Sequence, residues 1–341
     1  MKKRVTMKEI AERLNLSVNA VSLALNDRAG VSEETRRLVL NAAEEMGYLD
    51  QSTRYTAAYS NKNICILLED RFFKDMQFYG RILLGLEEAA KKAGYDLFIN
   101  SFEKNQEIPA CVEQQKVSGL IVVGKIDDEY LKRLKSYSIP VLLLDHESVE
   151  TPTDCVMTNN VAGAYKLTKY LLDTGHVHIA GVFKADDSQG KERHKGYVKA
   201  LNEAGIPYDP DMVIWFHTED RKSKPVLMVE RMITQKIPLD AVVSYNDQIA
   251  LEVIKTLQKR NVQVPKDVSV TGYDNSIISE NGLVPLTTIA HPQEKLGEMA
   301  AELLLEQIRK VPPEESRVER LIKPELIIRE STKQKLKNIK S

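Results

Sequence analysis

From residue 64 onward, short apolar runs alternate with longer amphipathic stretches, and this alternation constrains the fold more than any other feature of the chain. Runs typical of buried strands cover 64–68, 95–99, 119–123, 140–144, 178–183, 241–244 and 268–271. Helical periodicity marks 76–93, 160–173, 190–204, 247–260 and 293–309. Strands that alternate with helices predict parallel, doubly wound α/β sheets, and the two series of strands predict two lobes.

Polar side chains directly follow the predicted strands, at the edge where doubly wound sheets bind their ligands. They are Asp70, Lys125, Asp145 and His146 in the first lobe and Lys184, Asp186, Asn246, Asp247 and Asp274 in the second. A hydroxyl-binding fork and apolar ring faces, the groups that hold sugars, can come from Arg193, Trp215, Phe72, Phe73 and Phe78. Each residue alone is better explained as a helix cap or a core side chain. Together they predict a sugar-binding cleft.

The first 48 residues carry a separate pattern of three short helices. Thr6 and Glu9 form a capping box at the start of the first helix. Ser17 is a suitable N-cap for a second helix over 18–25, and a third helix is expected to begin at Ser32. The face of the second helix turned away from its apolar residues carries Val18, Asn19, Ser22 and Leu23. The pattern fits either a DNA-reading helix-turn-helix or a plain three-helix bundle.

This segment resembles the DNA-reading domain of the lactose-repressor/galactose-repressor family through VTMKEIA (5–11), LSxxxVSxxxN (16–26), VSxxTR (31–36) and GY (47–48). The resemblance implies that the second helix enters the major groove, where Val18, Asn19 and Leu23 would face base edges. It places Thr6, Ser17, Ser22 and Asn26 near phosphates. Asn19 can bond adenine through two atoms, and Val18 can contact a thymine methyl group. Leu23 replaces a frequent arginine, so the operators of relatives cannot be transferred to this chain.

Residues 49–62 are polar and lack an apolar stripe, which marks them as a linker. The family resemblance implies a hinge helix here, whose leucine wedges into the minor groove of DNA. Ala57 stands at that leucine position and is too small to wedge well. Either Tyr55 or Tyr59 wedges into the groove instead, or this chain bends DNA less. Arg54 can contact phosphate in either case. A passive tether remains the alternative.

Residues 63–330 resemble the effector domain of the same family, a two-lobed fold like that of periplasmic binding proteins. The matching motifs are GHxHIA (175–180), RxxGY (193–197), YNDxxA (245–250) and VPxDVSVxGYD (264–274). By this resemblance, a sugar would be held by Asp145, Arg193, Trp215, Asn246 and Asp274. The run GVFKADDxQG (181–190) is similar to the effector half of the bacterial arabinose repressor, which implies a pentose such as arabinose as the effector.

Other function classes have weaker support. Residues 119–126 nearly fit a phosphate-binding loop, but the middle residues are a strand-like run and Ile126 lacks the hydroxyl that Mg²⁺ requires. Six scattered histidines give no metal spacing, and no cofactor or catalytic motif is present, so we expect no enzyme. The three cysteines, Cys65, Cys111 and Cys155, are far apart and are expected to be small core residues. No export signal or membrane-length apolar run occurs, so we expect a cytoplasmic protein.

We therefore expect a repressor of a sugar-utilisation operon, released from double-stranded operator DNA by its sugar. Because the net charge is −1, this expectation rests on the motifs and not on a basic surface. The expected parts are a reader over 1–48, a hinge over 49–62, lobe one over 63–158 and 291–320, lobe two over 159–290 and 321–330, and a basic tail over 331–341. Two readers on a pseudopalindrome imply a homodimer, and the tail lacks the heptads of a coiled-coil tetramer. Three alternatives stay open: control by a corepressor, control by a phosphorylated partner protein, and a sugar-binding protein without a regulatory role.

Overall fold

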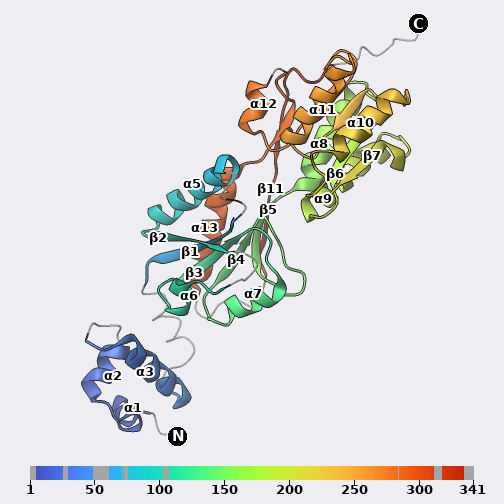
Figure 1. Cartoon of the computed structure of the whole chain (residues 1–341). Coiled ribbons are helices and arrows are strands. Elements are labelled where there is room, and N and C mark those ends of the chain that lie inside the picture. The colour runs from blue at the N-terminus through green and yellow to red at the C-terminus, as the bar shows by residue number, and fades with distance from the viewer. Residues whose placement is uncertain are drawn as a thin grey trace. The chain divides into compact units, whose positions relative to one another are not determined.

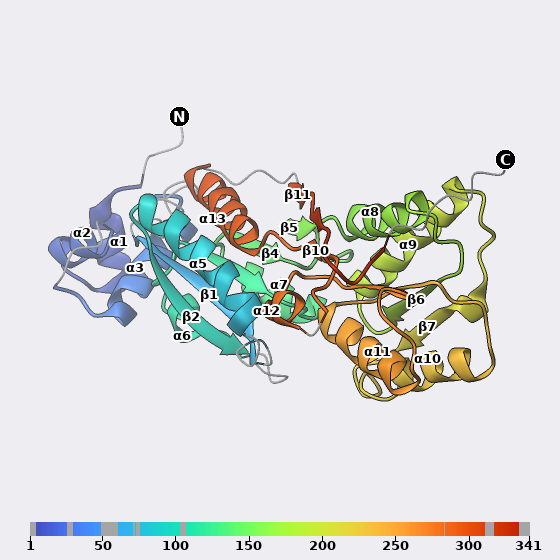
Figure 2. The ribbon, with the colours of Figure 1, turned by 90° about the horizontal axis from the view of Figure 1, so that it is seen from above.

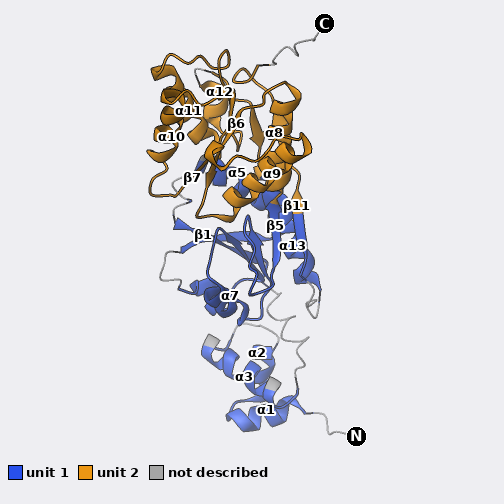
Figure 3. Cartoon of the chain, turned by 90° about the vertical axis from the view of Figure 1, so that its right-hand side faces the viewer, with its two compact units in different colours: residues 1–157, 294–320 blue, residues 158–293, 321–341 orange. Residues whose placement is uncertain are grey.

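The computed structural model of the chain is shown in Figure 1. It describes residues 5–25, 30–48, 61–70, 72, 76–102, 107–282, 284–310 and 317–333. The chain divides into two compact units (Figure 3). Unit 1 comprises residues 1–157 and 294–320, and unit 2 comprises residues 158–293 and 321–341. Within the described residues, no helix is both long and apolar enough to cross a membrane.

Three helices, α1 (Met7–Leu14), α2 (Val18–Leu25) and α3 (Glu33–Glu45), begin unit 1 and have a core of their own. The buried side chains of this core include Ile10, Val21 and Val39, one from each helix. Since a small separate core is what a three-helix reader needs to fold, residues 5–48 are a distinct structural element within unit 1.

The ends of these helices follow the caps that the sequence indicates. Thr6 and Glu9 form the predicted capping box, in which the Thr6 N–H donates to Glu9 Oε2 at 2.8 Å. The third helix begins at Glu33 and not at Ser32, because the Ser32 hydroxyl is the cap and accepts the N–H of Thr35 at 3.1 Å.

The α/β part of unit 1 is built on a six-stranded sheet in the order β11-β5-β4-β3-β1-β2. The strands are β1 (Asn63–Glu69), β2 (Asp96–Phe102), β3 (Gly119–Val123), β4 (Val141–Leu144), β5 (Asp154–Thr158) and β11 (Glu319–Ile322). The helices are α5 (Met76–Lys92), α6 (Ala110–Glu113), α7 (Asp128–Lys135) and α13 (Gln293–Arg309). Neighbouring strands from β5 to β2 are parallel, so their carboxyl ends lie along one edge. Residues 64–68 of β1 are fully buried, as in a strand covered on both faces.

Unit 2 contains a parallel sheet in the order β7-β6-β8-β9, with β6 (Ile179–Lys184), β7 (Val213–Phe216), β8 (Ala241–Val243) and β9 (Ser269–Thr271). Its α-helices are α8 (Asn160–Asp173), α9 (Ser188–Glu203), α10 (Lys224–Thr234), α11 (Asp247–Lys259) and α12 (Ile277–Asn281), and the short 3-10 helix η2 (Pro210–Met212) precedes β7. A separate antiparallel pair joins β10 (Thr288–Ala290) to β12 (Glu325–Ile327). Helices α8 and α9 cover one face of the parallel sheet and α10 and α11 the other (Figure 2), because each pair shares an apolar cluster with alternate residues of β6 and β8.

The predicted fold class, three N-terminal helices followed by parallel α/β lobes, is confirmed. The predicted start of a basic tail at residue 331 is wrong. Ser331 is fully buried, and its hydroxyl donates to the carbonyl of Val270, while its backbone N–H donates to Pro285 at 2.9 Å. Thr332 is also buried and shares a hydrogen bond with the Thr287 hydroxyl at 2.7 Å. Unit 2 therefore extends at least to Thr332, because these small polar side chains find partners inside it.

The boundaries of the predicted lobes also shift slightly. Residue 158 and residues 291–293, which were expected in lobe one, belong to unit 2. Residues 49–60 of the predicted hinge and 334–341 of the predicted tail lie outside the described residues.

Candidate functional site

The amino end of α2 presents its first predicted DNA contacts to solvent. Val18 and Asn19 are both exposed. Ser17, also exposed, caps α2, since its Oγ accepts the N–H of Ala20 at 3.0 Å. An exposed amide and an exposed apolar side chain at the start of a helix match the geometry of a recognition helix, whose N-terminal residues contact base edges.

The other predicted DNA contacts are less open. Ser22 and Leu23 are half-buried, and a Cβ added to Gly30 would lie 3.1 Å from Leu23 Cδ1. Leu23 therefore lies close to Gly30. The hydroxyl of Thr6 is exposed but donates to Glu9 Oε2 at 3.0 Å. The remaining predicted contacts, Asn26, Arg54, Ala57 and Tyr59, lie outside the described residues.

In unit 1, the residues predicted for the first lobe lie at the carboxyl ends of neighbouring parallel strands. Asp70 directly follows β1, Lys125 lies two residues after the end of β3, and Asp145 and His146 directly follow β4. Asp145 has a left-handed backbone with φ of 59°. Burial lowers the pKa of His146, and the charge of Lys125 lowers it further. The lowered pKa favours the neutral imidazole, which can donate one hydrogen bond and accept another.

Aromatic rings accompany these polar groups in unit 1. Phe72 stacks on Tyr79 with ring centroids 4.0 Å apart, and Phe78 meets Tyr79 edge-on at 4.9 Å. Phe72 also lies close to Gly124 at the end of β3, where an added Cβ would be 2.3 Å from Phe72 Cε2. Phe73 lies outside the described residues. This group places aromatic rings next to the end of β3, and an aromatic ring is the kind of apolar surface that sugar sites use.

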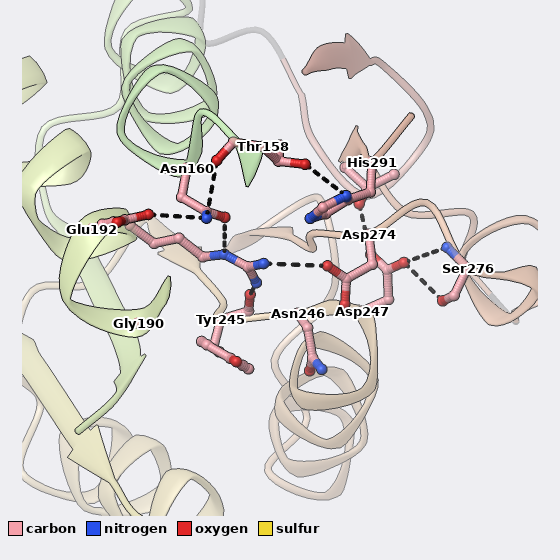
Figure 4. Close-up of polar contacts among 12 residues, drawn as sticks. Thr158, Asn160, Gly190, Glu192, Tyr245, Asn246, Asp247, Asp274, Ser276 and His291 are labelled. Atoms are coloured by element: carbon pink, nitrogen blue, oxygen red, sulfur yellow. Dashed lines mark hydrogen bonds and ion pairs between the residues drawn. The ribbon is translucent and has the colours of Figure 1, made fainter. Parts of the chain in front are cut away.

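In unit 2, Arg193 on α9 is the centre of a hydrogen-bond network, and its partners Asn160, Tyr245 and Asp274 are labelled in Figure 4. Only 4% of its surface is exposed. Its Nε donates to Asn160 Oδ1 at 3.1 Å, one terminal nitrogen donates to the backbone carbonyl of Tyr245, and the other lies 3.4 Å from Asp274 Oδ1. The guanidinium carbon is 3.7 Å from the ring centre of Tyr273. Burial alone would lower the pKa of Arg193, but the carboxylate of Asp274 and the neighbouring tyrosines raise it above its usual value, so the charge is kept.

Asp247, the first residue of α11, supports this site from inside the protein. Its Oδ2 accepts hydrogen bonds from the N–H of Ser276 at 2.7 Å and from the Ser276 hydroxyl at 2.8 Å, and its Oδ1 accepts one from the Thr288 hydroxyl at 2.6 Å. Burial and the charge of Asp274 raise the pKa of Asp247 to about 7. Both carboxyl oxygens are thus engaged within unit 2, so Asp247 ties α11 to the loop after β9 and to β10.

Asn246 and His291 are two further predicted or neighbouring polar residues of unit 2, and their hydrogen bonds differ from those of Asp247. Asn246 caps α11 through Oδ1, which accepts the N–H of Ile249 at 3.0 Å. Its Nδ2 has no hydrogen-bond partner among the described residues and is available to a ligand. His291 is buried and bonds Thr158 Oγ1 at 3.0 Å, and burial together with the charge of Arg193 lowers its pKa to about 3, which keeps it neutral.

Lys184, at the end of β6, belongs to the same network. Its Nζ lies 3.1 Å from Asp187 Oδ2, which also accepts the hydroxyl of Tyr245 at 2.7 Å. Because Tyr245 in turn accepts from Arg193, the contacts form one connected set. We call this set the unit 2 polar network; its members are Asn160, Lys184, Asp186, Asp187, Arg193, Tyr245 and Asp274.

Trp215, predicted as a ring face for a sugar, is half-buried in unit 2. Its ring lies 4.8 Å from His194 and 5.9 Å from Phe183, in a cluster between the sheet and α9. Among the described residues, no hydrogen bond or ring contact joins Trp215 to Arg193.

The sequence did not predict three members of the network, Asn160, Asp187 and Tyr245, as ligand-site residues. It also did not predict Glu192, which lies beside the network and accepts a hydrogen bond from Asn160 at 3.0 Å. Asp187 and Tyr245 lie within the GVFKADDxQG and YNDxxA runs, so their neighbours gave a signal. Asn160 gave none, because only the folded chain brings the start of α8 next to α9. Among the described residues, no group of three or more His, Cys, Asp or Glu side chains is placed to hold a metal ion.

Comparisons with known proteins agree with this arrangement. Residues 6–51 match the family "Bacterial regulatory proteins, lacI family", and residues 168–332 match "Periplasmic binding protein-like domain". The HTH-type transcriptional repressor PurR of Pasteurella multocida is 30% identical over 97% of this chain and 99% of its own length. The arabinose metabolism transcriptional repressor of Halalkalibacterium halodurans is 32% identical over 80% of this chain and 75% of its own length.

Two solved structures with bound sugars are similar as well. The cellobiose complex of the transcriptional regulator CelR has a TM-score of 0.69 and 25% identity, covering 96% of this chain and 100% of that one. A LacI family transcriptional regulator from Enterococcus faecium with bound ribose has a TM-score of 0.65 and 26% identity, covering 80% of this chain and 100% of that one.

The similarity to PurR runs through both the reader and the two α/β parts, and the relatives are named as repressors and regulators, not as enzymes. Because the similarity includes the DNA-reading domain, this chain is not a sugar-binding protein without a DNA-binding domain. The chain is a DNA-binding transcriptional repressor of the lacI family of bacterial regulatory proteins.

Proposed function

We propose that this repressor senses an arabinose-type pentose and leaves its operator when the sugar binds. The observation that carries the proposal is Arg193 in the unit 2 polar network. A guanidinium has five N–H donors. Asn160, Tyr245 and Asp274 use three of them, which leaves two for sugar hydroxyls. The free Nδ2 of Asn246 adds further donors at the end of the adjacent strand.

Two kinds of relative support a sugar, and a pentose in particular. The similar solved structures hold cellobiose and ribose, and one similar repressor is named for arabinose metabolism. The PurR relatives bear no sugar in their names. The experiments below therefore distinguish a sugar inducer, which weakens DNA binding, from a corepressor, which strengthens it.

We further propose that the repressor acts as a homodimer in the cytoplasm. Large apolar side chains are exposed on α5 and on β2, the outer strand of the unit 1 sheet: Met76, Leu84, Phe98 and Ile99. A second copy of the chain that covered these side chains would remove them from water and bring two readers to a pseudopalindromic operator. Sedimentation should give a dimer for the natural chain and a monomer for L84K/I99K. V149K, at an exposed valine elsewhere in unit 1, is the control and should stay dimeric.

A thermal-shift screen of the full-length repressor tests the sugar proposal. The screen includes arabinose, ribose, glucose and cellobiose, because a ligand at 100 times its Kd adds about 2.7 kcal/mol to stability. N246S keeps an N-cap oxygen but loses the amide donors, so it should weaken sugar binding roughly tenfold while the unliganded melting temperature changes little.

The outcomes separate the alternatives. A sugar that raises the melting temperature and weakens DNA binding supports an inducer. A ligand that raises the melting temperature and tightens DNA binding would make the protein a corepressor-dependent regulator instead. If no sugar shifts the melting temperature, the sugar proposal fails.

A further inference from the structure

We propose that the unit 2 polar network selects for uncharged sugars and rejects sugar phosphates and sugar acids. This inference rests on the proposed sugar-sensing function and specifies its ligand class. It is carried by the charge pairing of the network, in which both cationic side chains, Lys184 and Arg193, are already held by carboxylates of the protein.

Lys184 is held most firmly. The side chains of Lys184 and Asp187 are 16% and 20% exposed, so little water screens their contact at 3.1 Å. Asp186 adds a second carboxylate oxygen 4.0 Å from the ammonium. Asp187 itself is fixed, since Oδ1 caps α9 through the N–H of Gly190 at 2.6 Å and Oδ2 accepts the Tyr245 hydroxyl. Lys184 could turn toward a ligand anion only by leaving a carboxylate that cannot follow it.

Arg193 is fixed in a similar way. Its side chain is 5% exposed and is paired with Asp274, while Asn160 and the carbonyl of Tyr245 hold the plane of the guanidinium. Its two remaining N–H groups can donate to neutral hydroxyls, but its charge is already balanced. Arg193 therefore recognises hydroxyl oxygens without supplying a free positive charge.

The charges of the network add to a negative value. Lys184 and Arg193 give +2, and Asp186, Asp187 and Asp274 give −3, hence −1 for these five described side chains. Burial opposes the ionised form of Asp186, but the Thr218 hydroxyl and N–H bond the carboxylate, and the net pKa is lowered. A phosphate or carboxylate group on the ligand would bring its own negative charge, stripped of hydration, next to this net negative charge. A hydroxyl carries no charge and can exchange its hydration for hydrogen bonds to the network.

Calorimetric titration of the full-length repressor with arabinose and with arabinose 5-phosphate tests the inference. We expect the natural chain to bind the sugar at least 100-fold more tightly than its phosphate. D187N removes the nearer of the two carboxylates that pair with Lys184 but keeps a side chain that can cap α9. In this variant the preference for the sugar over its phosphate should fall at least tenfold. The double variant K184Q/D187N should recover the natural preference, because it also removes the ammonium whose nearer carboxylate partner D187N takes away.

D173N is the matched control. Asp173 pairs with Lys169 at 3.1 Å near the end of α8, so this variant makes the same charge change away from the network and should keep the natural preference. If the natural chain binds the phosphate as tightly as the sugar, the inference is overturned while the sugar sensor stands. An unchanged preference in a folded D187N also overturns it. If neither compound binds, the proposed sugar-sensing function fails and this inference falls with it.

Discussion

D247N should remove the pH dependence that the Asp247 carboxyl gives to the free energy of unfolding of unit 2. Asp247 is 1% exposed, and burial together with the charge of Asp274 raises its pKa from 3.8 to about 7. In the unfolded chain the carboxyl group titrates near 3.8, so the folded state binds the proton more tightly. The stability that this group contributes is therefore fully present below pH 3.8 and is lost as the pH rises through 7.

The size of the effect follows from the two pKa values. They differ by about 3, and each pKa unit corresponds to about 1.4 kcal/mol, so the full loss is about 4 kcal/mol. Between pH 4.5 and pH 8, about 3 kcal/mol of this loss should occur. The amide of the variant can still accept from Ser276 through its oxygen and donate to Thr288 through its nitrogen, but it does not titrate.

Trp215 provides the readout, because it is the only tryptophan of the chain and lies on β7 of unit 2. Urea unfolding followed by its fluorescence, at pH 4.5, 6 and 8, gives the free energy of unfolding for both proteins. The stability of the natural chain relative to the variant should fall by about 3 kcal/mol from pH 4.5 to pH 8. A difference that stays constant over this range would refute the raised pKa of Asp247.

Three further predictions concern other parts of the molecule. G196A should destabilise unit 2 by about 1–3 kcal/mol, because its Cβ would lie 2.3 Å from the carbonyl oxygen of Val161 on α8; an unchanged urea midpoint of the tryptophan signal would contradict this close approach. N19A should reduce discrimination at one base pair by about 1–3 kcal/mol in fluorescence anisotropy with operator variants, and equal losses on all sequences would mean that Asn19 only contacts phosphate. Cys111 should react with iodoacetamide at pH 7 faster than an ordinary thiol, because a hydrogen bond from Cys65 lowers the pKa of Cys111 to about 7; mass spectrometry that finds buried Cys65 labelled as fast would argue against the assignment.

The strands and helices that the sequence predicts are those with an unbroken pattern. β1 and β3 are continuous apolar runs, and their buried positions match the prediction. The sequence does not predict β7 or α7, although β4, β8 and β9 are no longer than β7 and are predicted from their apolar runs. α7 has eight residues and carries just three buried side chains, Tyr130, Leu131 and Leu134. A short helix of this kind is specified by its neighbours in the fold and not by its own periodicity.

For the candidate site, the sequence predicts the positions of the residues but not the directions of their side chains. Parallel strands share an edge, so residues such as Lys184, Asn246 and Asp274 could be located from the ends of the predicted strands. The direction of each side chain could not. Asn246 and Asp247 are adjacent, yet the amide of Asn246 stays open and the carboxyl of Asp247 turns into unit 2. Trp215 packs toward α9, because alternation along β7 places it on the face that α9 covers.

The central claim is that a sugar controls DNA binding by this repressor. Fluorescence anisotropy of the full-length protein with DNA from the promoter region of its own gene, at one fixed salt concentration, tests it most directly. We predict specific binding that weakens at least tenfold when arabinose is saturating. Specific binding that no sugar changes, or no specific binding at all, would contradict the account.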